Sequence, residues 1–384
     1  MISVYLDNGS TSFPKAPGVG QAMHNYIENA GYNIGRGGYN SSYSLEAKIL
    51  GVREKIRDFF GFNRESNVIF TPNITFSLNY IIQGMLKTGD ELVISSMEHN
   101  AVARPAQAAS ERGIVLNIAT CNEKGHLDLD DFSRVVTPRT KAVVMLHGSN
   151  VSGSLFPICE IGRICREKGV FFIVDAAQTA GVFPINMKEM NIDGLAFTGH
   201  KGLLGPQGIG GLLLNEDLAE ALSPIIQGGT GSHSDSLIMP DFMPDKLEAG
   251  TLNLPGIMGL SAALDYLNER GVDAIRSEEL KLAGAFIKEL IECEDVNMIG
   301  PGADEERCPI VSLDFIGRDN AEVAFRLDSE FGIMTRCGLH CAPLAHRTLK
   351  TFPQGTVRFA FGYENTEDHV AYAVQAIKRI LKSS

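Results

Sequence analysis

Apolar runs of strand length are the feature that most constrains the fold of this 384-residue chain. Val170 to Asp175 is an almost continuous apolar run, and similar runs occur at Lys141 to Leu146 and Ile192 to Phe197. Such runs indicate strands buried on both faces, as in a parallel sheet covered by helices. Helix-like stretches, for example Ile158 to Lys168, separate several of them. We therefore expect an open α/β sheet that is flanked by helices.

Polar residues directly follow several of these predicted strands. In open α/β sheets, ligands bind beyond the carboxyl ends of the strands. The segments at these ends are Glu98-His99-Asn100, His147-Gly148-Ser149-Asn150, Asp175-Ala176-Ala177-Gln178 and the loop from Thr198 to Lys201. Their common placement predicts a ligand site at this edge of the sheet.

One lysine, Lys201, lies in a tight loop between two predicted core strands. The loop reads Thr198-Gly199-His200-Lys201-Gly202, and Gly205-Pro206-Gln207-Gly208 follows. Glycine lets a ligand approach the backbone closely. A lysine that attacks a carbonyl needs a fixed and partly desolvated position, because burial lowers its pKa. A surface lysine in a hairpin is the alternative interpretation of this loop when it is taken alone.

Two further segments could contact an anion. The turn Thr71-Pro72-Asn73-Ile74-Thr75 precedes a predicted helix from Phe76, so free backbone N–H groups and the Thr75 hydroxyl suit an anion there. Arg36 lies in a glycine-rich loop, where it suits contact with an anion or a substrate. The alternatives are a threonine that only caps the helix and a loop that is only a linker.

Net charge, apolar runs and cysteine content limit the partners and the cellular location that we expect for this chain. Lys+Arg 34 against Asp+Glu 46 gives a net charge of −12 without a basic block, which argues against nucleic acid or an anionic membrane as partner. No apolar run has the length of a membrane span and the N-terminus does not read as a signal peptide, so we expect a cytoplasmic protein. The seven cysteines form no Cys-x-x-Cys pair and are expected to be reduced thiols.

The pattern of elements changes near Leu260, where helices and short strands suggest a smaller α+β domain. We expect residues 15–260 to form the large α/β domain. Residues 1–14 and 261–384 are expected to form the small domain, which carries the predicted loop from Arg336 to Pro343.

Four of the residues at the predicted edge together suit one cofactor. Asp175 can keep a pyridine nitrogen protonated, Lys201 can form a Schiff base, His99 can stack on a ring, and the helix start near Thr75 can hold a phosphate. These are the requirements of pyridoxal phosphate. Each residue also has an ordinary alternative role, such as Asp175 as a helix cap. The placement of all four at the same predicted edge favours the cofactor.

With these motifs, the chain resembles the class V aminotransferase superfamily, and within it the cysteine desulfurase and selenocysteine lyase family. The resemblance runs from Tyr5 to Arg358 and rests on Thr198-Gly199-His200-Lys201, on Asp175-x-x-Gln178 and on Glu98-His99-Asn100. It implies the fold type I of pyridoxal-phosphate-dependent transferases, in which a large domain has a mostly parallel seven-stranded sheet and a smaller C-terminal domain is α+β.

The resemblance also implies roles for residues at matching positions. Lys201, His99 and Cys341 are the implied catalytic residues, with Cys341 as the persulfide carrier. The expected cofactor contacts are Lys201, Asp175, Gln178, His99, Thr75, Ile74, Asn73, Thr198, His200 and Thr251. The expected substrate contacts are Asn150, Arg358 and Arg36. Glu248-Ala249-Gly250-Thr251 resembles a segment that reaches a phosphate across a dimer interface, which implies a homodimer.

The implied reaction removes sulfur from L-cysteine and gives L-alanine and a persulfide on Cys341, with an acceptor protein for the sulfur as a further partner. Two departures from the family pattern leave the substrate open. Asn73 and Ile74 stand where a glycine and a threonine are usual, and we expect Asn73 to adopt a left-handed turn there. Cys337 and Leu339 replace a threonine and a histidine. Selenocysteine lyase, or a related β-lyase acting on cystine or cysteine derivatives, is the alternative reading.

A function of another class also has to be considered. Cys337, His340, Cys341 and His346 could form a metal site in a structural or delivery module, although their spacing is not a recognised zinc pattern. A catalytically silent cofactor-binding scaffold is a third reading, and the presence of Lys201 argues against it. If Cys341 is the sulfur carrier, Arg336 and His340 are the neighbours in sequence that could supply positive charge to it.

Overall fold

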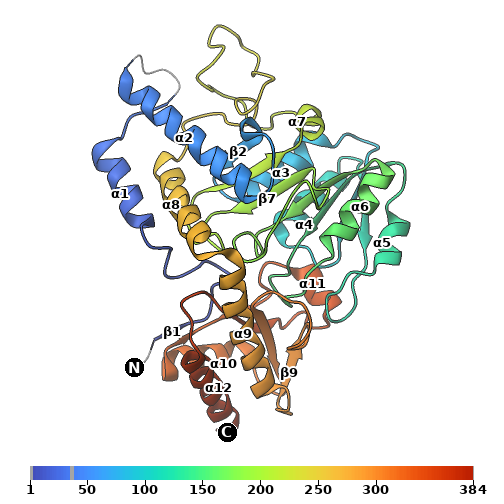
Figure 1. The fold of residues 1–384 in the computed structure, drawn as a ribbon. Helices are drawn as coiled ribbons and strands as arrows, with labels where there is room; N and C mark the ends of the chain where they lie inside the picture. The colour runs from blue at the N-terminus through green and yellow to red at the C-terminus, as the bar shows by residue number, and fades with distance from the viewer. Residues whose placement is uncertain (1–2, 35–38, 384) are drawn as a thin grey trace.

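A seven-stranded sheet forms the centre of the larger part of the structure, which is a computed structural model that describes residues 3–34 and 39–383 (Figure 1). β8 pairs antiparallel with both of its neighbours, and the other pairs are parallel, which confirms the predicted mostly parallel sheet. The strands in spatial order are β2 (Val68–Thr71), β8 (Gly210–Leu214), β7 (Gly194–Thr198), β6 (Phe171–Asp175), β5 (Thr140–Leu146), β3 (Glu91–Ser95) and β4 (Val115–Ala119).

Apolar side chains from the sheet enter two separate cores, because successive residues of a strand point to opposite faces. Val143 and Met145 of β5 lie in one core, whereas Ala142 and Val144 lie in the other. The helices that supply the first core are α2 (Asn40–Phe59), α6 (Ile158–Lys168) and α8 (Leu254–Arg270). Those that supply the second are α3 (Ile74–Met85), α4 (Asn100–Ser110) and α7 (Glu216–Ala221). Also in this part are α1 (Val19–Asn29) and α5 (Leu129–Val135).

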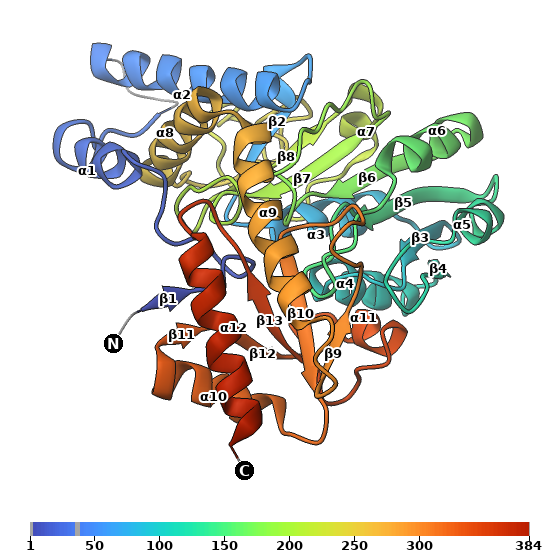
Figure 2. The same ribbon diagram turned by 60° about the horizontal axis from the view of Figure 1, so that its bottom comes forward.

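The smaller part is an antiparallel sheet with helices on it (Figure 2). Its strands in spatial order are β12 (Arg336–Gly338), β13 (Thr356–Ala360), β10 (Ile310–Phe315) and β9 (Val296–Ile299). Its helices are α9 (Val272–Leu290), α10 (Asn320–Phe331) and α12 (Glu367–Lys382). β1 (Val4–Tyr5) pairs with β11 (Ile333–Met334), so the N-terminal segment lies against this part. The short helix α11 (Pro343–Thr348) follows β12 in sequence but packs with Ala345 in the first core of the large part. The proposed domain boundary at residue 260 falls inside α8.

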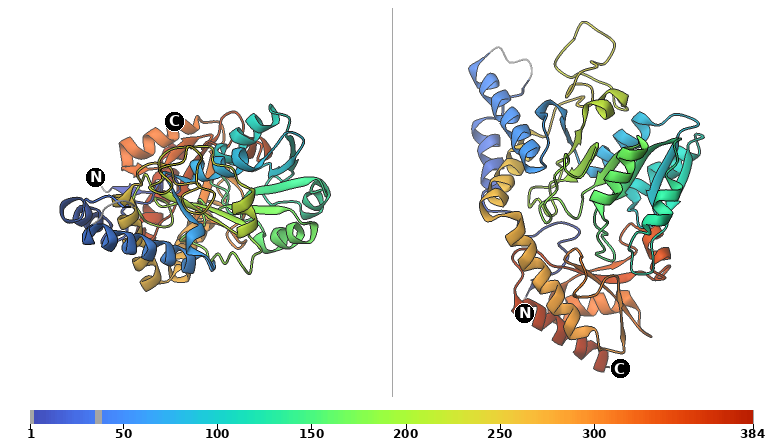
Figure 3. Two further views of the ribbon diagram at one scale, coloured as in Figure 1. Left: turned by 90° about the horizontal axis from the view of Figure 1, so that it is seen from above. Right: turned by 45° about the vertical axis from the view of Figure 1, so that its right-hand side comes forward.

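The segment from Arg336 to Pro343 differs from the predicted loop. Its first three residues form β12, in which Cys337 pairs with Val357 of β13. A strand of three residues is too short to show a periodic pattern, and only its partner strand makes it recognisable. The segment between α7 and α8 projects from the large part (Figure 3), and Leu237 in it is fully exposed. Within residues 3–34 and 39–383, no helix is both long and apolar enough to cross a membrane.

A buried ion pair joins α2 to the segment that leads to Thr251. Arg53 donates from Nη1 to Glu248 Oε1 over 2.8 Å and from Nη2 to Oε2 over 2.6 Å. Glu248 Oε1 also accepts from the backbone N–H of Phe70 in β2. Both side chains of the pair are more than nine-tenths buried, so loss of one partner leaves the other charge buried without its counter-ion.

We predict that Arg53→Met lowers the free energy of unfolding by about 3–5 kcal/mol, because it leaves the Glu248 carboxylate buried and unpaired. The double variant Arg53→Met/Glu248→Leu is expected to recover part of this loss. Urea unfolding of the two variants and the wild type measures the effect. A cost of the single variant equal to that of the double variant would contradict the importance of the pair.

Candidate active site

Asp175 lies at the carboxyl end of β6, where parallel strands direct their polar ends to one edge. Its side chain is buried, and Oδ1 accepts from the backbone N–H of Ala177 over 2.9 Å. Burial raises the pKa of Asp175, while the bond from Ala177 and the charge of Lys201 act in the opposite direction. A buried carboxyl at such a place is suited to a cationic partner such as a protonated ring nitrogen.

Glu98, from the predicted polar segment Glu98-His99-Asn100, is a second buried carboxyl at the same edge. Its Oε1 accepts from Ser95 Oγ over 2.5 Å and from Leu146 N over 3.2 Å. Its Oε2 is buried and has no partner in the described part of the chain. Burial, and to a lesser degree the charge of Asp175, raise the pKa of Glu98 to about 8. Glu98 is therefore held as a neutral acid beside Asp175 at neutral pH.

Lys201 follows β7 in a turn that packs closely against the chain beyond Asp175. A Cβ atom at Gly202 would lie 2.6 Å from Ala180 O, so glycine is needed where the two loops meet. Burial lowers the pKa of Lys201 to about 8, and the charge of Asp175 partly offsets this effect. An amine with such a pKa can act as a nucleophile or base near neutral pH. The structure thus brings Lys201 and Asp175 to one edge, as predicted.

Two polar atoms of the lysine loop are buried without a partner. Thr198 Oγ1 and His200 Nδ1 make no hydrogen bond to any residue that the structure describes. Unpaired buried polar groups are costly, so such atoms suit a ligand that can pair with them. Phosphate oxygens accept hydrogen bonds from a hydroxyl and from a ring N–H. These two residues therefore fit the phosphate group that the sequence predicts.

The start of α3 lies at the same edge of the sheet. Thr71 of β2 pairs with Gly210, which in turn pairs with Thr198. Free N–H groups at the start of a helix suit an anion. The details differ from the expected ones: Asn73 is extended with φ −173° instead of left-handed, because its side chain caps α3 by accepting from Phe76 N. Asn73 is thus the cap, not Thr75.

The two residues after this cap differ in exposure. Ile74 packs into the core with its side chain, which leaves only its backbone for a ligand. Thr75 is exposed, and its carbonyl accepts a hydrogen bond from Asn79 Nδ2 over 2.8 Å. A direct contact of either residue with a phosphate stays a prediction.

His99 caps α4 with its ring. Nδ1 accepts from the backbone N–H of Ala101 over 3.0 Å, so Nε2 carries the proton of the neutral ring. Burial first, and then the charges of Lys201 and three arginines, lower the pKa of His99 to about 4. The ring is therefore neutral at physiological pH. A neutral, partly buried imidazole is suited to stacking on a flat cofactor ring.

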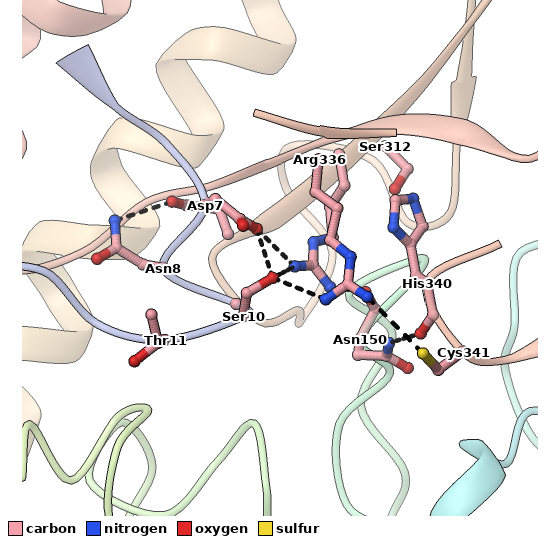
Figure 4. A network of polar contacts seen from close by, with 12 residues as sticks. Asp7, Asn8, Ser10, Thr11, Asn150, Ser312, Arg336, His340 and Cys341 are labelled. Atoms are coloured by element: carbon pink, nitrogen blue, oxygen red, sulfur yellow. Dashed lines mark hydrogen bonds and ion pairs between the residues drawn. The ribbon is translucent and has the colours of Figure 1, made fainter. Parts of the chain in front are cut away.

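Arg358 of β13 is buried between the small part and Asn150 of the large part. Its neighbours Asp7 and Asn150 are shown in Figure 4. Its Nη2 donates to Asp7 Oδ1 over 2.7 Å, and Nη1 donates to the carbonyl of Asn150 over 3.1 Å. Its Nε and the Oδ1 atom of Asn150 are buried and unpartnered within the described residues. A guanidinium with a free N–H fits a substrate carboxylate. Gln178, the other predicted residue here, donates to Gly9 O over 3.1 Å.

Cys341 is exposed at the same junction, as expected for a carrier. Its carbonyl accepts from Asn100 N over 2.7 Å, and Asn150 Nδ2 donates to the carbonyl of His340 over 2.8 Å. The large part of the chain thus holds the backbone on both sides of the sulfur-bearing side chain. Arg336 Nη2 lies 3.7 Å from Cys341 Sγ and donates to it.

Of the two expected sources of positive charge, only Arg336 is found to reach the sulfur among the described contacts. The His340 ring is buried, with Nε2 3.1 Å from the carbonyl and hydroxyl oxygens of Thr356. Burial lowers the pKa of His340 well below its usual value, so the ring is neutral. Cys337 is partly buried against the core of the small part, and burial raises its pKa. Its packing against this core and its raised pKa make Cys337 less suited than Cys341 to act as a thiolate.

The described residues give no support to the metal-site alternative. Across residues 3–34 and 39–383, no group of three or more His, Cys, Asp or Glu side chains could hold a metal ion. His346 is buried, and its Nδ1 is 2.7 Å from Thr351 Oγ1.

Two predicted site residues are not placed at this edge by the described structure. Arg36 falls outside the residues that the structure describes. Thr251 is exposed and lines a cavity of about 640 Å³ together with Arg53 and Glu248, and Lys201 is not among the residues that line it. The contact of Thr251 with the cofactor of a partner subunit stays a prediction.

The sheet, the lysine loop and the buried carboxyl together are typical of one family of enzymes, to which the sequence of this chain is similar. A model of the class-V aminotransferase family matches residues 4–372, so the chain belongs to this family. The resemblance seen in the sequence is thereby confirmed. Enzymes of this family use pyridoxal phosphate, whose expected contacts fit the unpaired atoms of Thr198 and His200.

Within the family, several similar proteins are named as cysteine desulfurases. The cysteine desulfurase CsdA of Escherichia coli is 32% identical over 99% of this chain and 94% of its own length. A solved cysteine desulfurase from Thermococcus onnurineus is 32% identical, with a TM-score of 0.93 over 99% of this chain and 95% of that one. A solved CsdA structure, with an S-sulfonic acid, superimposes with a TM-score of 0.88 at 29% identity over 99% and 95% of the two chains.

We predict that Lys201 of the cofactor-free protein reacts with an acylating reagent with a half-maximal rate near pH 8. Burial disfavours the charged amine, so its proton is released below the usual lysine range. In Asp175→Asn the midpoint is expected to fall further, because the anion that favours the ammonium form is gone. Quantitative peptide mapping across pH measures both midpoints, with exposed lysines of the same digest as the reference. A midpoint near 10.5 would contradict the assignment.

Proposed function

We propose that this chain is a pyridoxal 5′-phosphate-dependent cysteine desulfurase that removes sulfur from L-cysteine and releases L-alanine, with the sulfur left as a persulfide on Cys341. The observation that carries this proposal is the position of Cys341. An exposed thiol with Arg336 as its donor lies beside His340, whose carbonyl is bonded by Asn150, the residue that also accepts from the buried Arg358. The identity of the similar proteins supports the same reaction.

The described residues supply the groups that the cofactor requires. When bound, pyridoxal phosphate provides an electron sink for the bonds at the substrate α-carbon. Thr198, His200 and the start of α3 would hold its phosphate, and Asp175 would hold the proton on its ring nitrogen. His99 would lie on the ring as a neutral imidazole. Gln178 would bond the phenolic oxygen.

Lys201 and Arg358 would act on the substrate itself. Arg358 would take the substrate carboxylate through its unpaired Nε, next to Asn150. Lys201 holds its proton only weakly, because burial lowers its pKa to about 8, so the free amine can remove the α-proton. Cys341 Sγ would then bond to the substrate sulfur as the carbon–sulfur bond breaks.

The quaternary structure and location are further parts of the proposal. We expect a homodimer in which Thr251 of each subunit contributes to the partner's phosphate site, which agrees with its exposed position. A cytoplasmic location and an acceptor protein for the persulfide sulfur are also expected. A fully active monomer in sedimentation measurements would rule out the dimeric site.

We predict that Lys201→Ala abolishes turnover, because the variant lacks the amine that removes the α-proton. The variant is expected to keep its fold, since Lys201 lies in a loop outside the two cores. Alanine formation from cysteine measures turnover, and circular dichroism checks the fold. Wild-type turnover by a folded variant would show that another residue carries out this step.

We predict that Cys341→Ala loses most of its activity on L-cysteine but keeps a large share on L-selenocysteine. A carbon–sulfur bond needs a thiolate to take the sulfur, whereas selenium is the better leaving group. Cys337→Ala is the matched control and is expected to affect both substrates modestly, because Cys337 packs against the small core. Alanine formation by each variant with each substrate is the measurement.

Three outcomes would change the proposal. If Cys337→Ala silences the reaction with cysteine, the carrier is the other thiol. If neither variant loses activity on cysteine, the protein is a lyase without a protein-bound persulfide. If the wild type acts only on selenocysteine, selenocysteine lyase is the correct function.

A further inference from the structure

The hydroxyl of Ser10 lies among three charged side chains at the junction of the two parts (Figure 4). Ser10 Oγ accepts from Arg358 Nη2 over 2.7 Å and from Arg336 Nη1 over 2.9 Å, and it donates to Asp7 Oδ1 over 2.8 Å. A serine hydroxyl has one donor and two acceptor sites. All three hydrogen-bonding sites of the Ser10 hydroxyl, in the turn after β1, are therefore occupied by charged side chains.

The two arginines that meet at Ser10 are a cross-strand pair. Arg336 of β12 and Arg358 of β13 are direct partners in the antiparallel register. Like charges directly opposite each other are destabilising. The charge of Arg336 accordingly adds to the effect of burial in lowering the pKa of Arg358, and Asp7 acts in the opposite direction. The Asp7 carboxylate and the Ser10 hydroxyl are thus what holds this pair together.

The two arginines bonded to Ser10 have different roles in the proposed reaction, one toward the substrate carboxylate and one toward the Cys341 sulfur. Arg358 presents its Nε, which is buried and unpaired within the described chain, for a carboxylate. Arg336 points its Nη2 at Cys341 Sγ. A guanidinium is planar and rigid, so a bond that fixes Nη1 of Arg336 also fixes the direction of Nη2.

We propose that Ser10 is a positioning residue, whose hydroxyl holds Arg336 against the Cys341 sulfur and so sets the reactivity of this thiol. The sulfur role of Cys341 rests on the proposed function, but the link from Ser10 through Arg336 to the thiol does not. Without the hydroxyl, no shared acceptor holds the two like-charged arginines near each other. Arg336 also loses the hydrogen bond that directs it to the sulfur.

The test is the rate at which iodoacetamide alkylates Cys341 in the purified holoenzyme without cysteine, followed by peptide mass spectrometry. Ser10→Ala is expected to slow this rate about tenfold, as for the loss of one hydrogen bond to a charged group. Arg336→Met is expected to slow it similarly, and the double variant no further, because both changes remove the same contact. Ser10→Thr keeps a hydroxyl and is expected to restore the wild-type rate.

Two references separate this effect from a general loss of structure. Ser312→Ala removes a buried hydroxyl on the strand beside Arg358. In the described structure this hydroxyl donates to Val151 O over 2.7 Å and not to either guanidinium. It is expected to leave the alkylation of Cys341 unchanged. Cys159 is also exposed and gives an internal reference rate in the same sample.

A wild-type rate in Ser10→Ala, or additive effects of Ser10→Ala and Arg336→Met, would overturn the proposal. Equal slowing by Ser312→Ala would also overturn it. Alkylation needs no turnover, so the result is independent of the proposed function. If the variants behave as expected in a protein that releases no alanine from cysteine, the positioning role stands and the desulfurase proposal fails.

Discussion

The backbone around Cys341 is the constraint on which the site depends. His340 and Cys341 have φ values of 47° and 59°, in the left-handed region that residues with a side chain rarely adopt. Such a conformation costs about 1–3 kcal/mol per residue and persists where surrounding contacts impose it. Here the carbonyls of both residues accept hydrogen bonds from Asn150 and Asn100 of the large part. These bonds hold the sulfur next to the edge that carries Lys201.

Buried charge is the second property that unites the site. Burial lowers the pKa of Lys201 to about 8 and raises the pKa values of Asp175 and Glu98. Shifts of this kind, caused by burial together with specific neighbours, are typical of functional sites. Arg358, Thr198 and His200 each keep a buried polar atom without a partner in the described part of the chain. The site is thus arranged for a ligand that brings a phosphate and a carboxylate.

The sequence allowed the sheet and its polar edge to be predicted, because the burial of a strand and the polar residues at its end follow from local patterns. Lys201 and Asp175 were found in this way, since both follow apolar runs that are almost entirely buried. Contacts between distant segments could not be predicted. Asp7 and Arg358 are 351 residues apart, and no local pattern indicates that they pair.

The same reason explains the residues that were misjudged or missed. Glu98 was predicted only as part of a polar segment after a strand. Its complete burial depends on surrounding strands that are distant in sequence. His340 was expected to offer charge to the neighbouring sulfur, but the small part encloses its ring beside Thr356. The left-handed turn expected at Asn73 was replaced by a side-chain cap, which needs extended backbone.

The most direct test of the account is the mass of the Cys341 peptide after the purified holoenzyme reacts once with an equimolar amount of L-cysteine, without reductant. We predict that this peptide gains the mass of one sulfur atom while one equivalent of alanine is released, and that the Cys337 site gains none. Alanine release with the extra sulfur on another cysteine, or with no sulfur on the protein, would contradict the assignment of Cys341 as the carrier.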